Sequence, residues 1–268
     1  MCIAYISVNQ PEWPLFIAAN RDEFHNRPSK IAAPWPNNQN IIAGIDLVAG
    51  GTWIGITRQG RFALLTNFRD PVNNIENAPT RGVLVSDFLK SSISPEKYMD
   101  FLQPQIQNYN GFNLIVGEVS SQKCRTLYIS NKQYPAGTQT LETGSHVISN
   151  HLLNTRWPKS MRLKKAFDEY NMNNLHNSLQ HAFTILKDTR KASDNELPST
   201  GVGIQMERLL SSPFIISPEY GTRCSTIIAV HNSGKVLFSE ASYDSDGILT
   251  QRHDWPFMLE GITSRPGM

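Results

Sequence analysis

The chain has 268 residues, of which 40% are hydrophobic and 18% are charged, so it can bury a large core and is not disordered by composition. Its 25 basic and 23 acidic side chains give a formal net charge of +2, with no run of five like charges. This balance argues against a nucleic-acid-binding surface and against a polybasic membrane patch. No apolar stretch approaches the roughly 18 residues of a transmembrane segment, and the N-terminus does not resemble a signal peptide.

The cysteine and histidine usage indicates a reducing compartment and no metal site. Cys2, Cys124 and Cys224 are widely spaced and form neither a disulfide framework nor a C-x-x-C motif. No pair of histidines has the spacing of a metal-binding helix face. We therefore expect a cytoplasmic protein, without a metal ion, that folds as a single domain over residues 1–268.

Short apolar runs predict strands in the first quarter of the chain. Residues 2–8 and 15–19 flank Gln10-Pro11-Glu12, which predicts a hairpin. Glycine turns at Gly50-Gly51 and Gln59-Gly60 separate the next runs. These further strands are predicted at 41–48, 53–57 and 62–66.

Helical patterns then alternate with strand pairs. Apolar residues at helical spacing predict a helix over 81–90, and Ser94-Pro95-Glu96 is a typical helix start. Strands are predicted at 112–119, 125–130 and 145–149. Helices are predicted at 158–169 and 173–187, a loop at 189–203, and a last hairpin from strands at 225–231 and 235–242.

This order of elements predicts an α+β fold. Strand pairs joined by tight turns form antiparallel sheets, and the intervening helices pack outside them. Two mainly antiparallel sheets with outer helices would give a four-layer αββα sandwich with strand 2–8 central, although the pattern also fits other α+β folds.

Cys2 is the first candidate for chemistry. Once Met1 is removed, Cys2 becomes the chain terminus, and its α-amino group, with a pKa of about 8, is a base beside the thiol. The alternative is a small apolar residue that begins a buried strand.

The tetrapeptide Asn20-Arg21-Asp22-Glu23 directly follows the apolar run at 15–19. Charged residues are costly to bury unless they are paired, so this segment is either a surface turn or part of a site. Pairing of strand 15–19 with strand 2–8 would bring Arg21 and Asp22 within reach of Cys2.

Other polar residues lie at the ends of predicted strands. Asn67 and Asn150 each end a strand, and Arg223 precedes the strand at 225–231. Such amides can donate to a developing oxyanion, and the alternative is a set of ordinary turns.

Motifs along nearly the whole chain carry a family resemblance. The chain resembles the NRDE family, also called the Transport and Golgi organization 2 family. The motifs are Met1-Cys2-Ile3, Ala18 to Phe24, Arg27-Pro28-Ser29, Gly50 to Gly55, Leu65 to Phe68, Tyr109 to Leu114, Ser149-Asn150 with Trp157, Leu197 to Val202, and Tyr220 to Thr226.

The resemblance implies an N-terminal-nucleophile hydrolase fold, similar to the choloylglycine hydrolase and penicillin acylase group, which cleaves amides through an N-terminal cysteine. It implies that Cys2 is the nucleophile and that Asp22 holds its α-amino group. Asn67 and Asn150 would surround the oxyanion, and Arg223 would be the cation beside the thiol, where it would lower the thiol pKa. Those hydrolases carry Arg-Asn-x-Asp, whereas here Arg21 directly precedes Asp22.

The resemblance also implies a second kind of function, because eukaryotic members of the family resemble haem chaperones and are linked to lipid handling. Three interpretations stay open. The chain is a hydrolase of a small-molecule amide that needs no cofactor, a non-catalytic carrier of haem or a haem-like ligand, or an adaptor with a relic site.

Overall fold

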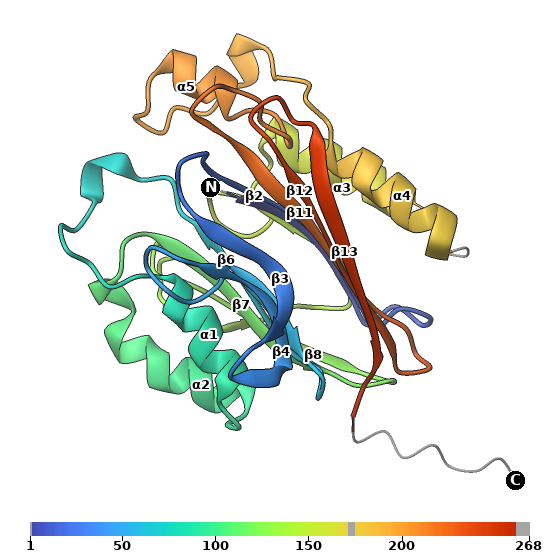
Figure 1. Ribbon diagram of the computed structural model, residues 1–268. Coiled ribbons are helices and arrows are strands. Elements are labelled where there is room, and N and C mark those ends of the chain that lie inside the picture. The colour runs from blue at the N-terminus through green and yellow to red at the C-terminus, as the bar shows by residue number, and fades with distance from the viewer. Residues whose placement is uncertain (1, 171–174, 261–268) are drawn as a thin grey trace, which may run out of the picture.

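A computed structural model describes residues 2–170 and 175–260. Over this part of the chain the strands form two antiparallel sheets, one of six strands and one of seven, that face each other. Helices cover the outer face of each sheet (Figure 1). This arrangement confirms the predicted four-layer αββα sandwich. Among the described helices, none is long and apolar enough to cross a membrane.

The six-stranded sheet joins the two ends of the chain. In spatial order its strands are β10 (Gly144–Ile148), β1 (Cys2–Val8), β2 (Leu15–Phe24), β11 (Tyr220–Val230), β12 (Lys235–Tyr243) and β13 (Leu249–Met258). The first strand of the chain, β1, pairs with β10 on one side and with β2 on the other. The expectation that strand 2–8 lies inside the sheet is therefore confirmed.

The seven-stranded sheet is a meander, because each strand pairs with the next strand in the sequence. Its strands are β3 (Ser29–Trp35), β4 (Asn38–Asp46), β5 (Ile54–Thr57), β6 (Arg61–Asn67), β7 (Phe112–Val119), β8 (Cys124–Ser130) and β9 (Gln139–Thr140).

Two pairs of helices form the outer layers. Helices α1 (Gly82–Lys90) and α2 (Pro95–Leu102) pack on the seven-stranded sheet, and α3 (Pro158–Asp168) and α4 (Leu175–Leu186) pack on the six-stranded sheet. Ser94 begins α2 as predicted, since its side chain accepts a hydrogen bond from the Lys97 amide. Residues 173 and 174 of the predicted helix 173–187 lie outside the described residues. The remaining helical segments are α5 (Ile204–Leu209) and the 3₁₀ turns Pro71–Asn73, Gln103–Asn108 and Asp194–Glu196.

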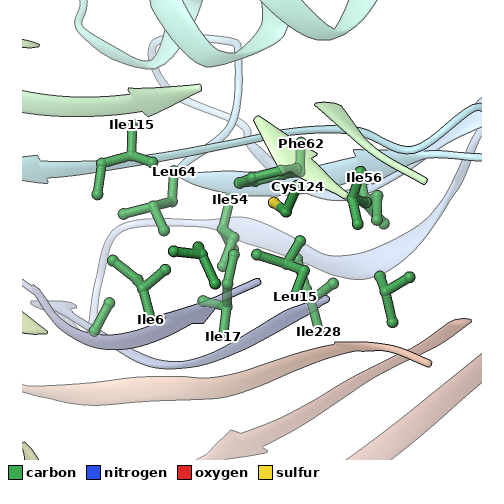
Figure 2. Close-up of a cluster of buried hydrophobic side chains, with 14 of the residues drawn as sticks. Ile6, Leu15, Ile17, Ile54, Ile56, Phe62, Leu64, Ile115, Cys124 and Ile228 are labelled. Atoms are coloured by element: carbon green, nitrogen blue, oxygen red, sulfur yellow. The ribbon is translucent and has the colours of Figure 1, made fainter. Parts of the chain in front are cut away.

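Side chains of β1 alternate between two apolar layers. Ala4 and Ile6 point into the core between the sheets, whereas Ile3 and Tyr5 pack against the helices. Because both faces of this strand are covered, its sequence is a continuous apolar run. Figure 2 shows the inner layer, where Ile6 and its neighbours point toward Ile54 and Phe62 of the opposite sheet.

Strand β2 is longer than the sequence predicted. It continues from Leu15 through Phe24, so Asn20-Arg21-Asp22-Glu23 is part of the strand and not a surface turn. Strands β3 and β13 were missed. The residues of β13 are mostly exposed, and those of β3 include Pro34 and are mostly half-buried, so neither carries a clear alternating apolar pattern.

Candidate active site

Cys2 and Arg21 are direct neighbours across the first two strands. The antiparallel register of β1 and β2 places Cys2 opposite Arg21. Alternation along β1 puts Cys2 on the same face as Ala4 and Ile6, which is the face toward the other sheet. The Arg21 side chain is only 6% exposed, and its guanidinium carbon lies 4.2 Å from the centre of the Trp53 ring.

A cavity of about 300 Å³ opens beside this pair, between the ends of the two sheets. Cys2, Trp53 and Asn67 line it together with the loop from Ala78 to Gly82 that leads into α1. The charged residues of its wall are Arg21, Asp22, Glu23, Arg27, Asp46 and Arg81. The cavity therefore combines a thiol with three guanidinium groups and three carboxyl groups.

The Cys2 thiol is held in its neutral form by its surroundings. Burial raises the pKa of the Cys2 thiol above its ordinary value, and the Asp22 carboxylate acts in the same direction. The Arg21 guanidinium and a backbone hydrogen bond from Asp22 oppose this effect. The thiol thus needs a base to become a nucleophile.

Asp22 is almost completely buried and is hydrogen-bonded to the neighbouring strand β11. Its Oδ1 atom accepts a 2.7 Å hydrogen bond from the Thr222 hydroxyl of β11. Burial raises the pKa of Asp22, whereas Lys159, Thr222 and Arg21 act to lower it. The Asp22 carboxyl group therefore interacts electrostatically with both the Cys2 thiol and a buried cation.

That cation, Lys159, is a site residue that the sequence interpretation missed. It lies near the start of α3, is 2% exposed, and has a pKa lowered to about 7, chiefly by burial and by the charge of Arg69. Asp22 and Cys2 act to raise the same pKa. A signal was present, because Lys159 shares the i, i+4, i+8 stripe of α3 with the apolar residues Leu163 and Phe167.

The two predicted asparagines meet, with different roles. The Asn67 side chain lines the cavity. Asn150 is fully buried and donates from Nδ2 to the Asn67 carbonyl oxygen at 3.0 Å. The Ser149 hydroxyl donates to the Cys2 carbonyl oxygen at 3.0 Å. Asn150 and Ser149 thus tie the end of β6 to the start of β1.

The Arg223 guanidinium, expected as the cation beside the thiol, is hydrogen-bonded to the backbone at the end of β2 and just after it. Nη1 of Arg223 donates to the carbonyl oxygens of Phe24 and Arg27, at 2.9 and 3.1 Å. A bulge in β11 between Thr222 and Cys224 leaves Arg223 without a paired residue on β2. The Arg21 guanidinium acts to lower the pKa of the Cys2 thiol.

The family model described as Transport and Golgi organisation 2 matches residues 1–245. The chain belongs to this family. A Transport and Golgi organization 2 homolog of Mus musculus is 33% identical over 277 residues, covering 97% of this chain and all of that protein. A homolog of Homo sapiens is 34% identical with the same coverage. The predicted family resemblance is confirmed.

A solved structure shares the fold of this family member. The N-acylethanolamine-hydrolyzing acid amidase ortholog of Caenorhabditis elegans superposes with a TM-score of 0.53 over 85% of this chain and 92% of that chain, at 14% sequence identity. Together with the two facing antiparallel sheets, this likeness confirms the predicted N-terminal-nucleophile hydrolase-like fold.

Proposed function

We propose that the protein hydrolyses a C–N amide bond through a thioester on Cys2. The observation that carries the proposal is the position of Cys2, at the first residue of an interior strand, beside Arg21 and facing a cavity. The fold it shares with a named amidase supports the same chemistry. Removal of Met1 supplies the base, because the α-amino group then belongs to the nucleophile itself.

The reaction proceeds in two balanced steps. The α-amino group of Cys2 takes the thiol proton, and the sulfur attacks the amide carbonyl carbon to form a tetrahedral oxyanion. The C–N bond then breaks, the leaving amine takes the proton, and a thioester remains. Water attacks the thioester with the same amine as base, which releases the acid and restores the thiol.

The surrounding residues take supporting roles in this scheme. Asp22 holds the α-amino group in place. Its negative charge also stabilises the ammonium form that the α-amino group takes after it accepts the thiol proton. Asn67 lines the cavity and is the candidate amide donor to the oxyanion, and Asn150 fixes Asn67 through the 3.0 Å bond to its carbonyl. Arg21 stands beside the sulfur, where its charge favours the thiolate.

The test is turnover of two short amides, N-hexanoylglycine and N-hexanoylethanolamine, followed by release of hexanoic acid. Hydrolysis is expected for at least one of them. It should be lost in Cys2→Ala and in a form with one extra residue before Cys2, because the amine is then acylated. Cys124→Ala, a change in the core between the sheets, is the matched control and should retain hydrolysis. Equal activity with and without the extra residue would rule out the α-amino base.

Haem carriage is the alternative proposal, and one observation favours it. Among the described residues that line the cavity, Cys2 is the one side chain of a type that ligates haem iron. Carriage would therefore use the Cys2 thiolate as axial ligand, reversibly. A haem titration should then show a shifted Soret band that disappears in Cys2→Ala. No spectral shift, or a shift that survives in Cys2→Ala, contradicts ligation at this site.

A further inference from the structure

Arg21 has a hydrogen-bond donor that nothing in the described part of the chain accepts. The Arg21 side chain is only 6% exposed, and its buried Nη1 atom has no hydrogen-bond partner. Trp53 holds the guanidinium in place from one face. A buried charged donor that lacks an acceptor is costly. Arg21 also lines the cavity, so an anion that enters the cavity lies next to this unneutralised guanidinium group.

Two of the three carboxyl groups on the cavity wall, those of Asp46 and Glu23, are engaged elsewhere. Asp46 accepts a 2.8 Å hydrogen bond from Nη2 of Arg27, and Glu23 accepts from the backbone amide of Phe24 at 2.9 Å. Within residues 2–170 and 175–260, no carboxylate oxygen lies within 4.0 Å of a guanidinium nitrogen of Arg21. The site therefore has a guanidinium that no acidic side chain of the described chain neutralises by contact.

A buried acid on the same sheet, Glu240, is likewise hydrogen-bonded to other groups. It is 1% exposed and accepts hydrogen bonds from the Ala32 amide at 2.7 Å and from the Thr226 hydroxyl at 2.8 Å. Burial raises the pKa of Glu240, which reduces the negative charge that it offers to Arg21.

A second guanidinium reaches the cavity from the loop that leads into α1. Arg81 precedes α1 and donates from Nη1 to the Gly111 carbonyl oxygen at 2.9 Å. It too has no carboxylate oxygen within 4.0 Å among the described residues. Helix α1 begins at Gly82, on the cavity wall, with neither a side-chain cap nor an acidic residue in its first turn. The positive end of its dipole adds to the two guanidinium charges.

We propose that the cavity binds a carboxylate group of the substrate between Arg21 and Arg81. Planar guanidinium groups match a carboxylate in shape and charge, and no carboxylate of the described residues contacts either of these two. The amide cleaved at Cys2 is then an acidic one, such as an N-acyl amino acid. The substrate class rests on the proposed hydrolysis, whereas the anion site itself does not.

Two alkylating reagents of nearly equal shape test the anion site without turnover. Iodoacetate carries a carboxylate, and iodoacetamide is its neutral counterpart. Both react with the same thiolate, so the ratio of their rates at Cys2 is independent of the thiolate fraction. Rates are measured by mass spectrometry of the N-terminal peptide, with glutathione as the unstructured reference thiol.

We expect the iodoacetate-to-iodoacetamide ratio at Cys2 to exceed that of glutathione by about tenfold or more, because Arg21 and Arg81, which no carboxylate of the described residues contacts, attract the carboxylate reagent. High salt should reduce the excess. Arg81→Gln should bring the ratio toward that of glutathione, and Arg81→Lys should retain most of it, which separates loss of charge from loss of folding. Arg125→Gln, which removes a half-exposed guanidinium paired with Glu96, is the matched control and should change nothing.

A ratio equal to that of glutathione, an unchanged ratio in Arg81→Gln, or no reaction of Cys2 with iodoacetate would overturn the proposal. Competition experiments identify the class of anion. Hexanoate should slow the labelling of Cys2, whereas the neutral hexanamide should not. Stronger protection by inorganic phosphate than by hexanoate would contradict the carboxylate assignment. Faster hydrolysis of N-hexanoylethanolamine than of N-hexanoylglycine would contradict the acidic substrate class and leave the hydrolase proposal standing.

Discussion

Nζ of Lys159 lies 3.4 Å from Oδ1 of Asn150, and both side chains are almost completely buried. Asn150 in turn binds the carbonyl of Asn67 on the cavity wall. A lysine from an outer helix thus reaches the polar contacts that hold the site together. Its pKa of about 7 makes this contact sensitive to pH near neutrality.

Lys159 should make stability depend on pH between about 7 and 10. Its pKa is lowered to about 7 in the folded chain, whereas an unfolded lysine titrates at about 10.4, so the unfolded chain binds the extra proton in this window. The free energy of unfolding therefore rises with pH there, by up to about 1.4 kcal/mol per pH unit.

Urea denaturation of Lys159→Met at several pH values measures this effect. The variant should lack the rise, and the difference from wild type should be largest near pH 7. Lys165→Met changes an exposed lysine of the same helix and should follow the wild-type curve. Parallel curves for wild type and Lys159→Met would show that the buried amine does not titrate in this window.

The reactivity of Cys2 should depend on Arg21 and not on Arg223. Removing the Arg21 charge raises the pKa of the thiol further, so Arg21→Met should slow iodoacetamide labelling of Cys2 at pH 8, by about tenfold for each unit of added shift. Arg223→Ala should leave the rate unchanged, since its guanidinium is bound to two backbone carbonyls. Slower labelling in Arg223→Ala than in Arg21→Met would reverse this assignment.

The turn at Gly50-Gly51 should position the loop that carries Arg81. Both glycines have a positive φ, but a Cβ atom on Gly51 would lie 2.5 Å from the Gly82 carbonyl group, whereas one on Gly50 meets nothing within 4 Å. Gly50→Ala should cost about 1 kcal/mol for the left-handed backbone, and Gly51→Ala about 1–3 kcal/mol more for the collision. Chemical denaturation measures both, and equal costs would mean that the loop moves freely.

Much of the fold could be predicted because its strands obey simple patterns. Residues 2–8 form an apolar run because both faces of β1 are covered, and Gly50-Gly51 marks a turn because its backbone needs a positive φ. The edge strand β13 could not be predicted, since its exposed residues follow no apolar alternation. The C-terminal end of β2 could not be predicted either, because its residues are polar. Pairing with β11 as well as β1 continues the strand through Phe24.

The candidate site was predicted in part. The pairing of the first two strands placed Cys2 beside Arg21, which follows from register once the hairpin is assumed. Arg223 was predicted beside the thiol by analogy alone; it lies at a bulge in β11, and its guanidinium donates to the Phe24 carbonyl oxygen. Lys159 was missed because a lysine near a helix start is usually exposed, and only its place on an apolar stripe marks it as buried.

The covalent intermediate on Cys2 tests the central claim most directly. Mature protein mixed with excess N-hexanoylglycine is quenched in acid within the first turnovers and digested with trypsin, which cleaves after Arg21. We predict a peptide 2–21 that begins at Cys2 and carries one hexanoyl group, absent from the Cys2→Ala protein. If turnover of the amide proceeds while peptide 2–21 stays unmodified, or if the active protein retains Met1, then Cys2 is not an N-terminal nucleophile.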